Sequence, residues 1–228
     1  MGNAPPVICV DGPSGSGKGT LALAIARKLD WNILDSGSLY RIVGLHAYLF
    51  DLSVEDDEAL KQVVESMNIQ FSTEPSPNLV VNGKDLTEAI RGEEATRYAS
   101  LVAKREKVRA ALLIRQKEFR KPPGLVADGR DMGTVVFPDA KLKIYLDASP
   151  EERARRRYVE LKDKGLNVSL PDLFQSLKER DAQDKNRRVS PLKVAPDSFV
   201  LDSTGLSIDE VIEKALAAAK QKGLQITN

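Results

Sequence analysis

The sequence predicts an α/β fold in which a parallel sheet is flanked by helices. Five short apolar runs each end in small or acidic residues: VICVDG (7–12), NILDSG (32–37), GLVADGR (124–130), KIYLDAS (143–149) and SFVLDST (198–204). Because these runs are continuous rather than alternating, they indicate strands covered on both faces, as in parallel sheets. Segments of helical period lie between the runs, and strands that alternate with helices predict an open α/β sheet.

Length and composition are those of one soluble globular protein. The chain has 228 residues, which is enough for one sizeable core with a smaller inserted lobe. Hydrophobic residues make up 42% and charged residues 29%, which is ordinary for this class. The formal net charge is only +1, from 34 basic and 33 acidic residues. Because proteins that bind polymeric nucleic acid are usually more basic, we expect no nucleic-acid partner, and any anion must be bound by local clusters.

The cysteine content and the first residues bear on the compartment. Cys9 is the only cysteine and lies in an apolar run, so we expect a buried structural thiol in a reducing compartment. No apolar run reaches the roughly 18 residues of a membrane span. The start, MGNAPP, resembles neither a secretory signal nor a myristoylation site, because Pro6 stands where the latter has Ser or Thr. The sequence therefore predicts a cytoplasmic protein with no membrane partner, and it shows no sign of an obligate protein partner.

The first strand leads into a glycine-rich loop and then a helix. Residues 12–20 read GPSGSGKGT, and the helical pattern LALAIARKL follows at 21–29. Glycine lets backbone N–H groups turn inward, where they and the positive end of the helix bind anionic oxygens, and Lys18 adds a full charge. A flexible turn is the alternative, but the complete GxxxxGK spacing favours a phosphate-binding loop (P-loop). The predicted ATP-binding residues are Gly12, Pro13, Ser14, Gly15, Ser16, Gly17, Lys18, Gly19 and Thr20.

The end of this loop differs from that of many P-loop proteins. In many GTPases and ATPases, the hydroxyl directly after the lysine ligates Mg²⁺. Here Gly19 follows Lys18, and the hydroxyl comes one place later at Thr20. This GKGT ending resembles that of the nucleoside monophosphate kinases. The resemblance implies that Mg²⁺ is bound with ATP, largely through phosphates and water rather than by a set of protein ligands, with Thr20 near the phosphates.

The middle of the chain departs from the alternation of strands and helices. IQFST (69–73) and NLVVNGKDL (78–86) predict a small antiparallel hairpin region with a tight Asn-Gly turn. Helix-rich sequence surrounds it, including one long helix within 95–120. We therefore predict that residues 36–105 form an inserted region that carries a small antiparallel insertion. The resemblance to the nucleoside monophosphate kinases implies that this region binds the nucleoside monophosphate (NMP).

The last third of the chain contains a charged arm and a capped final helix. ERARRRYVELKDKG (152–165) has the composition of a mobile arm, and we predict a short helical lid at 151–185. In SIDEVIEKALAAAKQK (207–222), Ser207 is followed three places on by Glu210, which predicts a helix that begins with a capping box. The predicted P-loop core domain comprises residues 1–35, 106–150 and 186–228.

Polar residues follow two of the predicted strands. In open α/β sheets, ligands bind beyond the carboxyl ends of the strands. Arginine suits an acceptor site for a second anion, because its planar fork binds phosphate oxygens in pairs. Alone, these segments are equally consistent with polar loops, and the tyrosine with a core position. The residues are Asp35, Ser36, Tyr40 and Arg41 after the second run, and Asp128, Arg130 and Asp131 after the third.

A third polar group lies in ERDAQDKNRR (179–188). On a helix, Arg180, Asp184 and Arg187 fall at i, i+4 and i+7, which is one face. Alone, this pattern is more typical of a solvated helix with a salt bridge, worth about 0.2–0.5 kcal/mol. Beside a P-loop, we interpret it as part of an acceptor site.

Together these motifs resemble those of the bacterial cytidylate kinases. The matching segments are VDGPSGSGKGT, LDSGSLYR, GLVADGRDMGTVVFP and ERDAQDKNR. The resemblance runs from about residue 7 to about residue 218, and the inserted region fits the bacterial form rather than the shorter eukaryotic kinases. Members of this family transfer the γ-phosphoryl group of ATP to CMP or dCMP, which gives ADP and CDP or dCDP.

The resemblance also implies roles for individual residues. Lys18, Arg130 and Asp131 are the implied catalytic residues, with Arg130 on the acceptor phosphate and Asp131 beside it. Two arginines, Arg109 and Arg187, are implied near the cytosine. The implied CMP-binding residues are Ser36, Arg41, Ser100, Arg109, Arg130, Asp131, Arg180, Asp184 and Arg187, of which Arg180 and Asp184 meet the ribose hydroxyls.

The charged arm has an implied role as well. By resemblance, Arg153, Arg156 and Arg157 close over the phosphates as a lid, and a solvated basic helix is the alternative.

Two other functions stay open from the residues alone. One is a P-loop kinase for another small acceptor, such as UMP or AMP. The other is a P-loop ATPase or switch that binds nucleic acid, which the run ERARRR favours and the near-neutral charge disfavours. A pseudokinase would require the loss of a catalytic group, and none is missing from the motifs.

Overall fold

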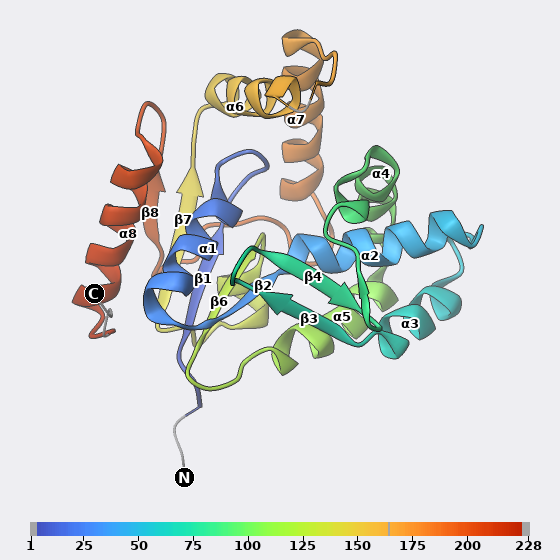
Figure 1. Ribbon diagram of the computed structural model, residues 1–228, viewed down its shortest axis with the longest axis horizontal. Helices are drawn as coiled ribbons and strands as arrows, with labels where there is room; N and C mark the ends of the chain where they lie inside the picture. The colour runs from blue at the N-terminus through green and yellow to red at the C-terminus, as the bar shows by residue number, and fades with distance from the viewer. Residues whose placement is uncertain (1–3, 164, 225–228) are drawn as a thin grey trace.

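The computed structural model describes residues 4–163 and 165–224 and has a five-stranded parallel sheet at its centre (Figure 1). Every neighbouring pair in this sheet is parallel, so the predicted fold class is confirmed. Expectations about residues 1–3 and the last four residues of the chain lie outside the described residues. In spatial order, the strands are β2 (Asn32–Asp35), β6 (Leu125–Gly129), β1 (Val7–Asp11), β7 (Leu142–Asp147) and β8 (Phe199–Asp202).

The register of the sheet brings the predicted polar segments to one edge. Asp11 at the end of β1 lies opposite Gly129 of β6 and Tyr145 of β7. Asp35 at the end of β2 lies opposite Asp128 of β6. The P-loop and the residues that follow β2 and β6 therefore emerge at the same edge, where an open α/β sheet binds its ligands.

Helices cover both faces of the sheet. On one face, α1 (Lys18–Leu29) and α8 (Ile208–Gln221) pack over Ile8 and Val10 of β1. On the other face, α2 (Ser36–Leu49) and α5 (Glu106–Glu118) pack over Val7 and Cys9. Alternate residues of β1 thus enter separate apolar clusters, which explains its continuous apolar sequence. Cys9 is buried, as predicted.

The edge strand β8 is an exception to the expectation that helices cover both faces of every strand. β8 exposes Phe199 (38%) and Val200 (55%) to solvent. Among the described strands it pairs with β7 alone, because β8 lies at the edge of the sheet. An apolar run alone does not distinguish an edge strand from a central one.

The insertion forms a second, antiparallel sheet of three strands, with β4 between the other two. The predicted Asn-Gly turn joins β4 to β5, where Asn82 and Gly83 have φ angles of 50° and 79°. The prediction of antiparallel pairing is confirmed, and one hairpin becomes a three-stranded sheet. The elements from α2 onwards are α3 (Asp57–Ser66), β3 (Ile69–Ser72), β4 (Asn78–Val81), β5 (Lys84–Asp85), the 3₁₀ turn η1 (Ala89–Arg91) and α4 (Glu93–Val102).

This insertion shares its interior with the parallel sheet. Leu60 of α3 and Val81 of β4 belong to the same cluster of buried side chains as Val7 of β1 and Leu125 of β6. That cluster continues to Phe137, which lies just beyond the single π-helical turn η2 (Met132–Val136). The inserted segment is therefore packed as part of the main body.

The expected long helix within 95–120 is two helices, so that prediction is wrong. α4 ends at Val102, and α5 begins at Glu106. Between them, Arg105 has an extended backbone, and its Nε atom donates to the Asp57 carboxylate at 2.7 Å. This contact with α3 fixes the bend, and it places Ser100 and Arg109 on different helices.

The predicted lid consists of two packed helices, α6 (Pro150–Asp163) and α7 (Leu170–Lys185). In Figure 1 they lie above the P-loop, at the edge of the sheet where the strands end. Within the described part of the chain, no helix combines the length and the apolar character that crossing a bilayer requires.

The capping box of α8 is confirmed and leads to a stability prediction. The Ser207 hydroxyl accepts from the Glu210 N–H at 3.3 Å, and the Glu210 carboxylate accepts from the Ser207 N–H at 2.8 Å. We expect Ser207→Ala to lower the free energy of unfolding by about 1 kcal/mol and the thermal midpoint by about 2–4 °C. Ser176→Ala, at an exposed position inside α7, is the control in calorimetry. Equal midpoints for both variants would contradict a role for the cap.

Candidate active site

The P-loop between β1 and α1 requires glycine at particular positions. A Cβ atom on Gly12 would lie 2.0 Å from the carbonyl oxygen of Leu146 on β7. Gly17, the residue before α1, has a φ of 92°, which is the left-handed region. Glycine is therefore required at these two positions. At the first it allows the loop to pass close to the sheet, and at the second it allows the backbone conformation that leads into α1.

Lys18 is the first residue of α1 and lies beneath the loop. Its Nζ atom donates to the carbonyl oxygen of Pro13 at 2.9 Å, and the Ser16 hydroxyl donates to the same oxygen at 3.1 Å. Burial lowers the pKa of Lys18, and the neighbouring Arg130 adds to this effect by repulsion. A buried ammonium group with cationic neighbours is stabilised by any anion that enters the loop.

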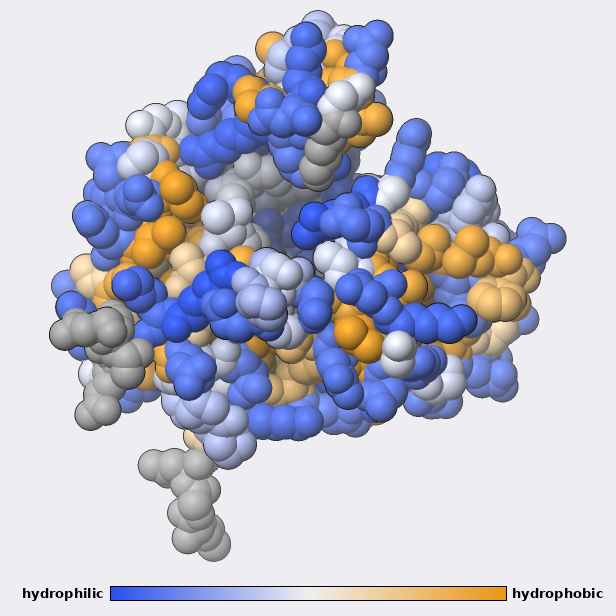
Figure 2. Space-filling model, in the orientation of Figure 1, coloured by the Kyte–Doolittle hydropathy of each residue, from blue (hydrophilic) through white to orange (hydrophobic). Residues whose placement is uncertain are grey.

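Lys18 is one of five cations that converge below the lid. Burial, followed by repulsion from Arg130, lowers the pKa of the Arg180 guanidinium to about 10. Within the described residues, no hydrogen bond or ion pair holds that guanidinium. Figure 2 shows the surface hollowed beneath the α6–α7 pair. An anion with several oxygens would offset this repulsion, as phosphate groups do. Arg130 and Arg180 act electrostatically on Lys18, and Arg130, Arg41 and Arg157 act on Arg180. The five residues are therefore Lys18, Arg41, Arg130, Arg157 and Arg180.

Two carboxylates border this group. Asp35 caps α2, where it accepts from the Ser38 N–H at 3.0 Å, and it lies 4.0 Å from the Arg41 guanidinium. Asp128 faces the loop: a Cβ atom on Gly19 would lie 3.3 Å from its Oδ2 atom. Burial raises the pKa of Asp128, against the attraction of Lys18. The Asp128 carboxylate thus lies next to Gly19, the position at which many other P-loop proteins have a hydroxyl side chain.

Arg130 and α7 are joined by an ion pair. The Arg130 Nε atom donates to the Asp184 carboxylate at 2.8 Å, and Arg187 lies 3.7 Å from the other oxygen of that carboxylate. Burial acts to raise the pKa of Asp184, but the Arg130 guanidinium holds it below its usual value. α7 ends at Lys185, so the expectation that Arg187 continues the helical face is wrong. The chain turns after the helix, and Arg187 still reaches Asp184.

A second cluster lies deeper and contains open hydrogen-bond donors. The Arg109 guanidinium donates to the Asp131 carboxylate at 2.6 Å, and its Cζ atom lies 5.6 Å from the ring centre of Tyr40. Nε and NH1 of Arg109, and Nε and NH2 of Arg187, are buried without an acceptor. An unsatisfied buried donor costs about 1–3 kcal/mol, so a ligand that carries acceptors fits here. We expected Asp131 beside the acceptor phosphate, whereas the structure pairs it with Arg109.

The two predicted serines have different surroundings. The Ser36 hydroxyl is buried at the start of α2 and accepts from the Gln116 side-chain amide at 2.9 Å. Ser100 donates its hydroxyl to the Thr96 carbonyl within α4 at 3.2 Å. Its own carbonyl accepts from Gln183 of α7 at 3.4 Å, which links α4 to the lid.

The three lid arginines do not act alike. Arg153 is buried, and all three of its guanidinium nitrogens bind protein acceptors: the Ala148 carbonyl at 3.0 Å, the Ser14 carbonyl at 3.0 Å and the Asp181 carboxylate at 2.6 Å. Arg153 was expected to contact phosphates, but its guanidinium instead links the P-loop, through Ser14, to α7, through Asp181. The missing side chain of Gly15 permits this, because a Cβ atom there would lie 3.2 Å from the Arg153 Cβ.

The other two lid arginines are nearer to solvent. Arg156 donates to the Ser16 carbonyl at 3.3 Å and to Ser203, the residue after β8. Arg157 pairs with Glu160 at 2.7 Å within α6 and interacts electrostatically with Arg180 of α7. Of the three, Arg157 is held least by other parts of the protein.

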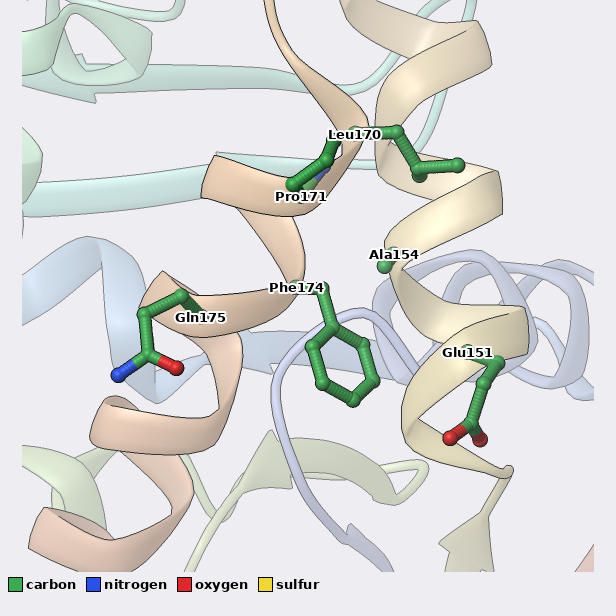
Figure 3. Close-up of a pocket in the computed structure, with 6 residues that line it drawn as sticks. All are labelled: Glu151, Ala154, Leu170, Pro171, Phe174 and Gln175. Carbon is green, nitrogen blue, oxygen red and sulfur yellow. The ribbon is translucent and has the colours of Figure 1, made fainter.

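A separate pocket lies between the first turns of α6 and α7 (Figure 3). It encloses about 340 Å³, and its lining is mostly apolar. It contains none of the predicted site residues and no basic side chain, so it does not suit a phosphate group. The lining residues are Glu151, Ala154, Leu170, Pro171, Phe174 and Gln175.

Three residues that sequence reasoning missed support the site. Gln116 orients the Ser36 hydroxyl, and Asp181 receives Arg153. Asp11 accepts two backbone N–H groups just after Asp131. Only Asp11 had a signal in the sequence, because it is an acidic residue at the end of a buried strand, directly before the P-loop.

Comparisons with known proteins identify the family of this chain. Residues 8–221 match the model of the family described as cytidylate kinase. A cytidylate kinase from Aeromonas salmonicida is 49% identical over 97% of both chains. One from Enterobacter sp. (strain 638) is 51% identical over 97% of this chain and 98% of its own. One from Stutzerimonas stutzeri is 52% identical over 96% and 97%, respectively. The resemblance inferred from the motifs is confirmed, and the chain belongs to the cytidylate kinase family.

Proposed function

We propose that this protein phosphorylates CMP and dCMP with ATP, by direct transfer between two nucleotides held at one edge of the parallel sheet. The observation that carries the proposal is the pairing of two adjacent clusters. One is a group of mutually repelling cations around Lys18, and the other contains the open, buried donors of Arg109 and Arg187. The first suits phosphates, and the second suits a base with acceptor atoms on its edge.

On the donor side, the P-loop, residues 12–20, receives the phosphates of ATP. The positive end of α1 and the inward N–H groups of the loop bind the oxygens. Lys18 reaches the β- and γ-phosphates, and it exchanges its bond to the Pro13 carbonyl for a bond to the nucleotide. Arg157 is the lid residue best placed to meet these phosphates, since Arg153 is committed to protein acceptors.

On the acceptor side, Arg130 and Arg41 bind the phosphate of CMP, and the Ser36 hydroxyl assists them. Gln116 donates to the Ser36 oxygen, so the hydroxyl hydrogen remains available for a phosphate oxygen. Arg180 and Asp184 of α7 meet the ribose.

The base-binding cluster favours cytosine over uracil. Cytosine presents two acceptors, O2 and N3, next to an amino group that donates. The open guanidinium donors of Arg109 and Arg187 suit the acceptors, and the Asp131 carboxylate suits the amino group. Uracil has an N3–H donor where cytosine has the N3 acceptor, so this donor would face the guanidinium donors. It has a carbonyl where cytosine has the amino group, so this acceptor would face the carboxylate. Ser100, two residues before the end of α4, completes the predicted CMP-binding set.

The chemistry needs positioning rather than a proton acceptor. The attacking oxygen belongs to an already ionised phosphate, so no general base is required. Holding donor and acceptor in line contributes about 7–11 kcal/mol to lowering the barrier. Lys18, Arg130 and the lid then stabilise charge on the transferred group.

Mg²⁺ fits the same site as a companion of ATP. When bound with ATP, it would supply positive charge that offsets the negative charge of the phosphates. The Asp128 carboxylate beside Gly19 and the Thr20 hydroxyl are the protein groups that would hold it, largely through water. A cytoplasmic location, and substrates that are small molecules rather than protein or nucleic acid, complete the proposal on the basis of composition.

The first test is a panel of acceptors. ADP formation from ATP and Mg²⁺ is measured with CMP, dCMP, UMP, AMP, GMP, TMP and no acceptor. We expect kcat/KM for CMP and dCMP to exceed that for UMP by roughly a hundredfold or more, because UMP would leave buried polar groups unpaired. ADP formation with a different acceptor would change the base that we assign to the pocket, but it would still support phosphoryl transfer between two nucleotides. Equal activity without an acceptor would favour an ATPase instead.

A further inference from the structure

Asp11 is a buried carboxylate to which the proposed mechanism assigns no role. It is the last residue of β1 and only 5% exposed. Its Oδ1 atom accepts from the Met132 N–H at 2.9 Å, and its Oδ2 atom accepts from the Gly133 N–H at 2.7 Å. Both oxygens therefore bind the chain immediately after Arg130 and Asp131.

The bound segment is a tight turn whose first N–H groups have no partner within it. In η2, the Val135 and Val136 N–H groups both donate to the Asp131 carbonyl, at 2.9 and 3.1 Å. The N–H groups of Met132 and Gly133 point back toward the sheet, where Asp11 receives them. A Cβ atom on Gly133 would lie 3.3 Å from the Asp11 Oδ2 atom, so glycine permits the close approach.

We propose that Asp11 is a positioning residue, whose ionised carboxylate fixes the Arg130–Asp131 corner for catalysis. This inference rests on the proposed function, because it concerns two residues of the proposed acceptor site. Residue 130 faces the phosphate cluster, and residue 131 pairs with Arg109 at the base-binding cluster. Because Asp11 binds the backbone directly after both residues, it sets the distance between the phosphate-binding cluster and the base-binding cluster.

The anchor is sensitive to protonation because, among the described residues, no cation forms an ion pair with Asp11. Burial raises the pKa of Asp11 to about 7, against the two N–H groups that it accepts. When the carboxyl group is protonated, one of its oxygens becomes a hydroxyl, which is a weaker acceptor, so one of the two N–H groups is held less strongly. The charged and titratable groups that face Asp11 are Cys9 from its own strand, Asp128 from β6, Arg130 and Asp131 from the corner, and Lys143 and Tyr145 from β7.

The sign of the stability effect separates this role from a purely structural one. The pKa of Asp11 is higher in the folded chain than its ordinary value of 3.8. Its contribution to stability is therefore full below pH 3.8 and lost as pH rises through about 7. Acidification from pH 8 to 6 does not unfold the protein through this group, so a loss of activity there that is absent from Asp11→Asn is not caused by unfolding through Asp11.

The test combines backbone NMR with kinetics on the full-length protein. In the wild type, we expect the amide signals of Met132 and Gly133 to titrate together between pH 6 and pH 8.5, and in Asp11→Asn we expect them not to titrate. At pH 8, we expect Asp11→Asn to lower kcat/KM for CMP by about ten- to a hundredfold. The ratio of wild type to variant should shrink toward one as pH falls to 6, because the wild type then becomes protonated too.

Asp197→Asn is the matched control. Asp197 is 61% exposed and pairs with Lys143 at 2.9 Å, so it neutralises a nearby charge without touching the corner. We expect its pH profile to follow the wild type. Wild-type amides that do not titrate, amides that titrate equally in Asp11→Asn, or a pH-independent activity ratio would each overturn the proposal. If the wild type does not use CMP, the proposed function fails, while the amide titration still decides the role of Asp11.

Discussion

Lys18→Ala is expected to lower turnover by about 10²- to 10³-fold or more while the fold survives. Removing one preorganised group that stabilises transition-state charge costs this much in other enzymes, which corresponds to about 3–4 kcal/mol. The tight loop depends on Gly12 and Gly17, so the variant loses one loop hydrogen bond, from Nζ to the Pro13 carbonyl, and keeps the turn. Steady-state kinetics with CMP and circular dichroism measure the two effects separately.

Lys141→Ala is the control for that variant. Lys141 is exposed just before β7, at the opposite end of the sheet from the P-loop, and its loss should leave turnover unchanged. Because burial lowers the pKa of Lys18 and phosphate oxygens raise it again, ATP binding at pH 8 should take up protons. Calorimetry in buffers of different ionisation enthalpy detects this uptake. Normal turnover in Lys18→Ala would remove the lysine from the mechanism.

Arg130→Ala is expected to damage use of the acceptor and leave the donor almost unaffected. The change removes a phosphate-binding fork and leaves the buried Asp184 with only the more distant Arg187, at 3.7 Å. Truncating one partner of a buried charged pair costs about 2–5 kcal/mol, so we expect kcat/KM for CMP to fall by roughly 30-fold to several thousandfold. The KM for ATP should change by less than about threefold. Initial rates with each nucleotide varied in turn measure both.

Two further variants sharpen this test. Arg130→Lys keeps the charge and loses the planar fork, so it should restore only part of the activity. Arg188→Ala, at an exposed residue that pairs with Glu106 on the surface, should behave as wild type. A collapse of ATP affinity with normal use of CMP would place Arg130 on the donor side.

The parallel sheet and the P-loop could be predicted because their signals are local. A continuous apolar run that ends in glycine or aspartate indicates a strand and its end with no knowledge of neighbours, and all five strands of the parallel sheet follow this pattern. It does not reveal burial, because the edge strands β2 and β8 are more exposed than the three strands between them. The capping box of α8 is likewise written in two residues, Ser207 and Glu210.

The structure differs from the sequence-based predictions where contacts between residues distant in sequence determine the local structure. Neither glycine nor proline marks the break between α4 and α5, and the bend is held by the Arg105–Asp57 pair across 48 positions of sequence. The Arg109–Asp131 pair joins positions 22 apart and shows that neighbouring residues 130 and 131 serve different clusters. The burial of Arg153 depends on how closely α6 approaches Gly15, which an arginine-rich sequence does not reveal.

The apolar cluster that joins the insertion to the sheet makes the inserted region inseparable from the rest of the enzyme. Leu60 and Val81 complete the same interior as Val7 and Leu125. Excising residues 69–86 as a cassette would uncover that interior, and transplanting them would require the matching surfaces of α5 and the parallel sheet to move with them. Evolution and protein engineering can therefore vary the polar rim of this region residue by residue, while its apolar side is inherited as one unit with the catalytic scaffold.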